Sequence, residues 1–177
     1  MNVLAFAASS SKNSINKQLV QYAGGLLAEQ NAQVDYLDIN DYEMPIYSTD
    51  REEASGVPQL ARDFYNKIGA ADAIVISFAE HNGNYTAAYK NVFDWASRID
   101  MKVFQGKPMV LLATSPGPGG AASVLSIAKT SAPFFDGLVK ADVSLPSFYD
   151  NFDSELKVVT NSEVNTKLKE GLAALKG

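Results

Sequence analysis

The sequence has 177 residues, 46% of them hydrophobic and 20% charged, which excludes long disorder, collagen-like repeats and a coiled coil. This length suits one globular domain, so we expect residues 1–177 to form a single unit. No apolar run approaches the roughly 20 residues that a membrane helix needs, and no basic residue precedes the short apolar run at the N-terminus. We therefore expect no membrane span and no signal peptide, and a cytoplasmic protein.

Cysteine is absent and His81 is the one histidine, which excludes disulfides, iron–sulfur clusters and multi-histidine metal sites. We expect no bound metal. The net charge is −5, and it is concentrated in residues 35–53, where seven acidic residues accompany only Arg51. We interpret this acidic segment as a solvated loop. Nucleic-acid binding requires a basic patch, and none is evident, so nucleic acid is not an expected partner.

Apolar runs of strand length alternate with helix-length patterns along the chain. Strands are expected at 3–8, 34–39, 73–78, 109–113 and 138–145, and helices at 14–30, 60–68, 87–98, 119–135 and 162–176. Gly24 and Gly25 weaken the first helix by roughly 1 kcal/mol each without removing its apolar stripe.

This alternation predicts a parallel sheet, because parallel strands need a crossover that is usually a helix. Five strands in this length indicate an α/β, flavodoxin-like, doubly wound fold with helices on both faces of the sheet. In such folds ligands bind at the carboxyl ends of the strands, near the point where the strand order reverses. That rule selects the loops that follow Ala8, Phe78 and Ala113.

The first of these loops is rich in hydroxyl groups and leads into a helix. A helix N-terminus presents unpaired N–H groups and a positive dipole end, and Ser9, Ser11 and Ser14 add further donors. The loop matches neither G-x-G-x-x-G nor G-x-x-x-x-G-K-[ST], so a terminal monophosphate fits better than a dinucleotide or a nucleoside triphosphate. The alternative is that Ser14 or Asn13 only caps the helix.

The second loop, residues 79–86, follows a very apolar strand. Asn82 and Gly83 tolerate unusual backbone angles, so backbone amides there can face a planar heterocycle. His81 is either an acid–base group or a loop residue that packs against a ligand. Glu80 is either a nucleophile or base, or a carboxylate at the surface or at a helix end. The third loop, residues 114–120, is either a ligand-approaching glycine loop or a simple tight turn.

Together these loops resemble the NADPH-dependent FMN reductase family, a flavodoxin-like group that includes bacterial quinone and chromate reductases. Ser9-x-Ser11-x-x-Ser14-x-Asn16 resembles the family's phosphate loop, and residues 79–82 (AEHN) stand at its P-E-Y-N motif. Residues 90–98 (KNVFDWASR) resemble its L-K-N-x-I-D-W-x-S-R stretch, the most specific part of the likeness. Departures occur where Ser11 replaces the usual Arg, His81 the Tyr and Thr86 a common Pro.

The resemblance implies that FMN is the cofactor, with NADPH or NADH as a transient co-substrate and a small-molecule electron acceptor such as a quinone or free flavin. Hydride would pass through the flavin, so no residue is assigned as catalytic. Expected around the phosphate are Ser9, Ser11, Ser14, Ile15 and Asn16; beside the isoalloxazine Ala79, Glu80, His81, Asn82 and Gly83; and along the ribityl chain and ring Thr114, Ser115 and Gly117. It further implies a homodimer or homotetramer, with Trp95 and Arg98 as interface candidates. From the residues alone, Trp95 is either a core residue or an interface residue.

Two other functions remain open at this point. One is a non-enzymatic module that binds FMN or another phosphorylated ligand, such as an electron carrier. The other is a transferase similar to nucleoside deoxyribosyltransferases, with Glu80 as the covalent nucleophile.

Overall fold

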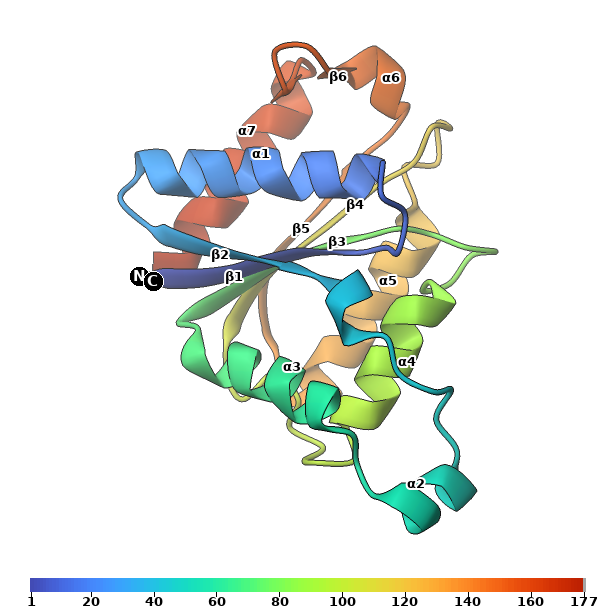
Figure 1. The fold of residues 1–177 in the computed structure, drawn as a ribbon. Helices are drawn as coiled ribbons and strands as arrows, with labels where there is room; N and C mark the ends of the chain where they lie inside the picture. The colour runs from blue at the N-terminus through green and yellow to red at the C-terminus, as the bar shows by residue number, and fades with distance from the viewer. Residues whose placement is uncertain (177) are drawn as a thin grey trace.

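The computed structural model describes residues 1–176 and contains a five-stranded parallel sheet in the order β2-β1-β3-β4-β5 (Figure 1). Its strands are β1 (Asn2–Ala8), β2 (Gln33–Asp38), β3 (Ala73–Phe78), β4 (Pro108–Thr114) and β5 (Leu138–Leu145). The helices are α1 (Ile15–Glu29), α2 (Thr49–Ser55), α3 (Gln59–Ala70), α4 (Ala87–Ala96), α5 (Ala122–Ser131), α6 (Phe148–Asn151) and α7 (Ser162–Ala173). The expected flavodoxin-like α/β fold is confirmed.

Each face of the sheet is covered by its own layer of helices (Figure 1). Helices α1 and α7 pack on one face, where Leu19 and Leu168 join an apolar cluster with alternate residues of β1. Helices α3, α4 and α5 pack on the other face, where Phe64 and Trp95 belong to the second cluster. Strands β1, β3 and β4 are buried on both faces, which explains their nearly continuous apolar runs.

The acidic segment is more ordered than the sequence analysis expected. It contains the 3₁₀ turn η1 (Ile39–Tyr42) and helix α2, and several of its carboxylates pair with bases from elsewhere in the chain. Asp35 lies 2.7 Å from Lys67, and Glu52 lies 2.9 Å from Arg98. The expectation of a solvated loop is therefore wrong for these residues, because the partner bases are distant in sequence.

The remaining differences lie in the C-terminal half. The helix expected at 119–135 is α5 followed by the 3₁₀ turn η2 (Ala132–Phe135), since Gly120 and Ala121 adopt positive φ angles of 57° and 58° just before it. Residues 146–161, for which the sequence predicted no element, hold α6 and a small hairpin of β6 (Phe152–Asp153) and β7 (Val158–Val159). The chain then continues through α7 to the 3₁₀ turn η3 (Ala174–Lys176). None of the helices within residues 1–176 combines the length and apolar character required to cross a membrane.

The two adjacent glycines of α1 provide a test of the packing beside β2. A Cβ on Gly25 would meet no atom within 4 Å, whereas a Cβ on Gly24 would lie 2.1 Å from the Tyr36 hydroxyl. We expect Gly25→Ala to raise the free energy of unfolding by about 0.5–1 kcal/mol, because alanine is the better helix former. Gly24→Ala should gain less, since its methyl displaces Tyr36, whose hydroxyl donates to the Gln21 carbonyl.

Urea denaturation of the two variants measures both values. In a Tyr36→Ala background the obstacle is gone, so Gly24→Ala should then stabilise the protein as much as Gly25→Ala does. Equal gains from the two alanines in the wild-type background would contradict the contact.

Candidate flavin site

The three loops selected from the sequence follow β1, β3 and β4, which are neighbours in the sheet. Since the three strands are parallel, all three loops leave the same edge. The strand order reverses at β1, which pairs with β2 on one side and β3 on the other. The structure therefore brings the predicted loops together at the switch point where ligands bind in open α/β sheets.

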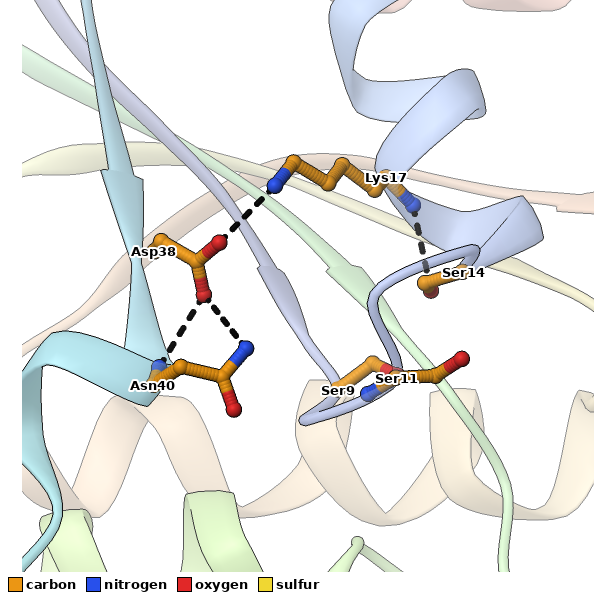
Figure 2. Close-up of polar contacts among 6 residues, drawn as sticks. All are labelled: Ser9, Ser11, Ser14, Lys17, Asp38 and Asn40. Atoms are coloured by element: carbon orange, nitrogen blue, oxygen red, sulfur yellow. Dashed lines mark hydrogen bonds and ion pairs between the residues drawn. The ribbon is translucent and has the colours of Figure 1, made fainter.

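The β1–α1 loop forms an anion site from backbone N–H groups and hydroxyls (Figure 2). Ser14 caps α1, its Oγ accepting from the Lys17 N–H at 3.3 Å. The N–H groups of Ile15 and Asn16, the first two helical residues, have no acceptor within the described chain, because the first turn of a helix lacks intrahelical partners. The Ser9 Oγ accepts from the Ser11 N–H at 3.3 Å, and Ser11 itself is exposed.

Lys17 contributes little positive charge to that anion site. Its ammonium lies 2.8 Å from the Asp38 carboxylate, and Figure 2 shows its side chain reaching toward the end of β2, away from Ser9 and Ser11. This hydrogen bond lowers the pKa of the Asp38 carboxyl below its usual value. A bound anion would thus meet hydroxyls and backbone amides rather than the Lys17 charge.

Asn16 fixes the β1–α1 loop to two neighbouring strands. Its side chain is 2% exposed, and its amide nitrogen donates to the Thr114 carbonyl at 3.1 Å. Its amide oxygen accepts from the Thr114 N–H at 3.1 Å and from the Ser77 hydroxyl at 2.8 Å. The side chain is fully engaged, so Asn16 positions the loop and has only its backbone N–H to offer a ligand.

The β3–α4 loop contains a tight hairpin turn. His81 and Asn84 exchange backbone hydrogen bonds of 3.0 and 3.1 Å, while Asn82 and Gly83 between them adopt φ angles of 54° and 75°. Two consecutive positive φ angles define the type I′ geometry that Asn-Gly favours. The turn projects His81, Asn82 and Gly83 to the surface, and a Cβ on Gly83 would meet no atom within 4 Å, so the backbone is open to a planar ligand.

Glu80 serves as an anionic cap for another helix. Its carboxylate accepts from the Val124 N–H at 2.9 Å, in the first turn of α5. A negative charge is favoured at a helix N-terminus, which agrees with the helix-end alternative for this residue. Ala79, beside it, is half-buried.

Thr86 closes the β3–α4 loop with two buried hydrogen bonds. Its hydroxyl donates to the Ala8 carbonyl at 3.1 Å and accepts from the Tyr89 N–H at 3.3 Å, which caps α4. Proline, common at this position in the family, can do neither. The departure therefore adds a direct link between the loop and the end of β1, and this link was missed by the sequence analysis.

The β4–α5 loop is hydrogen-bonded to residues 145–148 on one side and open to solvent on the other. The Thr114 hydroxyl is buried and donates to the Leu145 carbonyl at 2.7 Å, so this side chain is turned into the protein. The carbonyls of Ser115 and Gly117 accept from the N–H groups of Phe148 and Ser147. Beyond them the loop is unobstructed, since a Cβ on Gly117 would find no atom within 4 Å.

The arrangement fits FMN by the chemistry of its donors. Two free helix N–H groups and three serine hydroxyls suit a terminal phosphate, and the open backbones at Gly83 and Gly117 leave room for a flat ring system. Among the predicted residues, three have side chains that brace the scaffold: Asn16, Glu80 and Thr114.

The K-N-x-x-D-W stretch joins α4 to residues 44–47 by hydrogen bonds, which the sequence did not indicate. Asn91 accepts from the Tyr47 N–H at 2.8 Å and donates to the Met44 carbonyl at 3.0 Å, while the Trp95 indole donates to the Pro45 carbonyl at 2.8 Å. Trp95 is 1% exposed and belongs to the apolar core, so the structure supports the core alternative for this ring over the interface alternative. Arg98 pairs with Glu52 of the same chain.

Comparison with known proteins agrees with this site. The family model described as NADPH-dependent FMN reductase matches residues 1–149. The chain is 29% identical over 177 residues to an NAD(P)H-dependent FMN reductase of Pseudomonas aeruginosa, covering 99% of this chain and 93% of the relative. It is 30% identical to a 2-hydroxy-1,4-benzoquinone reductase of a Burkholderia species, covering 93% and 85%.

Among solved structures, FerB, a flavoenzyme NAD(P)H:(acceptor) oxidoreductase from Paracoccus denitrificans, superposes with a TM-score of 0.76 at 25% identity, covering 98% of this chain and 94% of FerB. Fold and site together define a flavodoxin-like flavoprotein. The chain belongs to the NADPH-dependent FMN reductase family and is an oxidoreductase that uses FMN with NAD(P)H.

Asn16 offers a test of how the loops are joined. In Asn16→Asp an acceptor oxygen replaces the amide nitrogen that donates to the Thr114 carbonyl, so two acceptors face each other in a buried position. We expect a loss of about 3 kcal/mol in the free energy of unfolding. Urea denaturation measures it, and Asn13→Asp, the same exchange at an exposed position of the loop, should change stability little. Equal stability of the two variants would refute this role for Asn16.

Proposed function

We propose that the three-loop site binds FMN with its phosphate at the N-terminus of α1, and that the enzyme passes reducing equivalents from NAD(P)H to a quinone. The observation that carries this proposal is the pair of unpartnered N–H groups at Ile15 and Asn16, placed beside the hydroxyls of Ser9, Ser11 and Ser14. Bound FMN supplies hydride and electron transfer chemistry. The chain's own residues have to bind FMN, orient its ring system and leave one face of the ring accessible.

The residue roles follow from the contacts. The helix N–H groups and serine hydroxyls donate to the phosphate oxygens, which needs no cation from Lys17 because that ammonium is paired with Asp38. The type I′ turn at Asn82 and Gly83 and the glycine backbone at Gly117 border the ring system. Glu80 accepts from the Val124 N–H at the N-terminus of α5 and so anchors the β3–α4 loop to that helix.

The proposal also covers the electron acceptor and the oligomeric state. The Burkholderia relative is named for the reduction of 2-hydroxy-1,4-benzoquinone, and this favours a small quinone as the acceptor here. We further propose one FMN-binding domain over residues 1–177, a homodimer or homotetramer, and a cytoplasmic location. Sedimentation of the FMN-loaded protein measures the assembly.

The phosphate position can be tested with Ser14→Glu. A carboxylate at this helix N-terminus repels the phosphate and occupies its donors, so FMN affinity should fall by roughly tenfold or more, given about 1.5–3 kcal/mol for a charge-assisted hydrogen bond. Quenching of flavin fluorescence measures the Kd at fixed salt.

Ser48→Glu is the matched control, because Ser48 caps α2 in the same way, and α2 lies below the sheet whereas α1 lies above it in Figure 1. Its Kd should equal that of the wild type. An unchanged Kd for Ser14→Glu would remove the phosphate from this loop.

Glu80→Gln separates the flavin mechanism from covalent catalysis. The amide oxygen of Gln still accepts from the Val124 N–H, so the loop keeps its anchor and loses only the charge at the helix end. We expect the kcat for quinone-dependent NADPH oxidation to stay within about threefold of the wild-type value, since the charge at a helix end contributes only about 0.3–1 kcal/mol. Complete loss of activity in a folded variant would instead assign Glu80 to the reaction itself.

A further inference from the structure

A second hollow lies between helices α4 and α5, on the face of β3 and β4 that these helices cover. Its volume is about 190 Å³. Its floor includes Met109 and Leu111 of β4, and its far wall includes Ala128 of α5. The walls are formed mainly by the aromatic side chains of Phe78, Tyr85, Tyr89, Phe93, Phe104 and Phe135. We call this hollow the aromatic cavity.

The aromatic cavity is separate from the proposed flavin site. None of the residues expected to bind FMN lines it. The link between the two is Tyr85, which lies in the β3–α4 loop after the type I′ turn and packs against Phe78 with ring centroids 5.6 Å apart. The cavity and the three-loop site are therefore neighbouring sites with different lining residues.

Tyr89 places an unsatisfied hydroxyl at this cavity. The residue is 2% exposed, and burial raises the pKa of its phenol well above the usual value. Its hydroxyl has no hydrogen-bond partner among residues 1–176, although every fully enclosed side-chain nitrogen or oxygen there has one. The hydroxyl therefore borders open space, and the space that Tyr89 lines is the aromatic cavity. Because the hydroxyl borders open space and has no partner in residues 1–176, it is available for a hydrogen bond to a ligand oxygen.

The other polar groups around the cavity set the character of its ligand. The Tyr85 and Ser131 hydroxyls are hydrogen-bonded to each other at 3.0 Å, which joins the β3–α4 loop to the end of α5. Lys90 and Asp94, also in the lining, are paired at 2.6 Å and leave no net charge there. A neutral ligand is favoured over an ion. For comparison, an apolar cavity of about 150 Å³ is large enough for benzene.

We propose that the aromatic cavity is a binding site for a neutral, single-ring aromatic molecule that carries a hydroxyl or carbonyl oxygen, with that oxygen hydrogen-bonded to the Tyr89 hydroxyl. The six aromatic side chains supply edge and face contacts to the ligand ring, and the volume limits the ligand to about the size of phenol. No chemical step is assigned to this site.

The probe for this proposal is 4-fluorophenol, titrated into the FMN-loaded protein and followed by fluorine NMR. We expect saturable binding of one molecule per chain. Tyr89→Phe removes the hydroxyl and keeps the ring, so it should weaken 4-fluorophenol binding by about three- to tenfold, as expected for the loss of one hydrogen bond. Fluorobenzene, which has no hydroxyl, should bind the variant as well as it binds the wild type.

Two further variants locate the probe. Tyr22→Phe is the matched control, because it removes a hydroxyl that bonds to Asn165 on the other face of the sheet, and both probes should keep their affinities. Ala128→Leu fills the cavity from α5 and should abolish binding of both probes while FMN affinity is unchanged. If Ala128→Leu does not fold, the proposal is tested by Tyr89→Phe alone. That variant should weaken binding of 4-fluorophenol and leave binding of fluorobenzene unchanged.

The proposal is overturned if 4-fluorophenol does not saturate the wild type up to its solubility limit. It is equally overturned if binding is indifferent to Tyr89→Phe, which would place the probe elsewhere, for example against the flavin. Probe binding that disappears as the protein self-associates would identify a second copy of the chain as the occupant. Failure on any of these grounds leaves the FMN assignment intact, since that assignment rests on FMN affinity and NADPH oxidation.

Discussion

The side chain of Asn16 is the interaction on which the site depends. A parallel sheet aligns its carboxyl ends but does not by itself fix the loops that leave them. Asn16 does so from the first turn of α1, with one donor and two accepted hydrogen bonds that reach β3 at Ser77 and β4 at Thr114. Because an asparagine amide offers both a donor and an acceptor in one plane, it can satisfy the N–H and the C=O of the same residue, Thr114. The start of α1 is thereby held at a fixed height above the strands.

Two further contacts, one buried and one partly buried, extend this constraint to the second loop. Thr86 ties it to the end of β1 through the Ala8 carbonyl, and Glu80 ties it to the start of α5 through the Val124 N–H. Each loop of the site is therefore hydrogen-bonded to a strand or helix that adjoins one of the other two loops. Such hydrogen bonds let exposed, glycine-containing loops keep a defined shape although they have few apolar contacts of their own. A preorganised ligand site requires loops of defined shape. The hydrogen bonds also explain why polar residues stand where the apolar strand pattern stops.

The sequence predicted the strands and most helices because β1, β3 and β4 are buried on both faces and read as continuous apolar runs. It predicted the three loops because their place follows from parallel topology. It could not reveal contacts over long separations. Three ion pairs of the acidic segment join residues 21, 32 and 46 positions apart, and Asn16 bonds to Thr114 at a separation of 98. Within the site, the sequence supplied the residue types, whereas only the folded chain separates side chains that face a ligand from those that brace the loops.

The absence of an arginine from the phosphate loop changes how the anion is held. Ser11 stands at that position and Lys17 is paired with Asp38. The other donors of the loop are hydroxyls, backbone amides and the exposed Lys12 side chain. Uncharged donors fixed in direction select an anion by geometry, whereas a mobile cation attracts any anion in range. The affinity of such a site depends on how well its amides are preorganised, and their position is set by Asn16 and the Ser14 cap. In the proposed phosphate site, the hydrogen bonds of Asn16 and Ser14 therefore contribute to anion affinity indirectly, by holding the backbone amides in place where the family usually has an arginine.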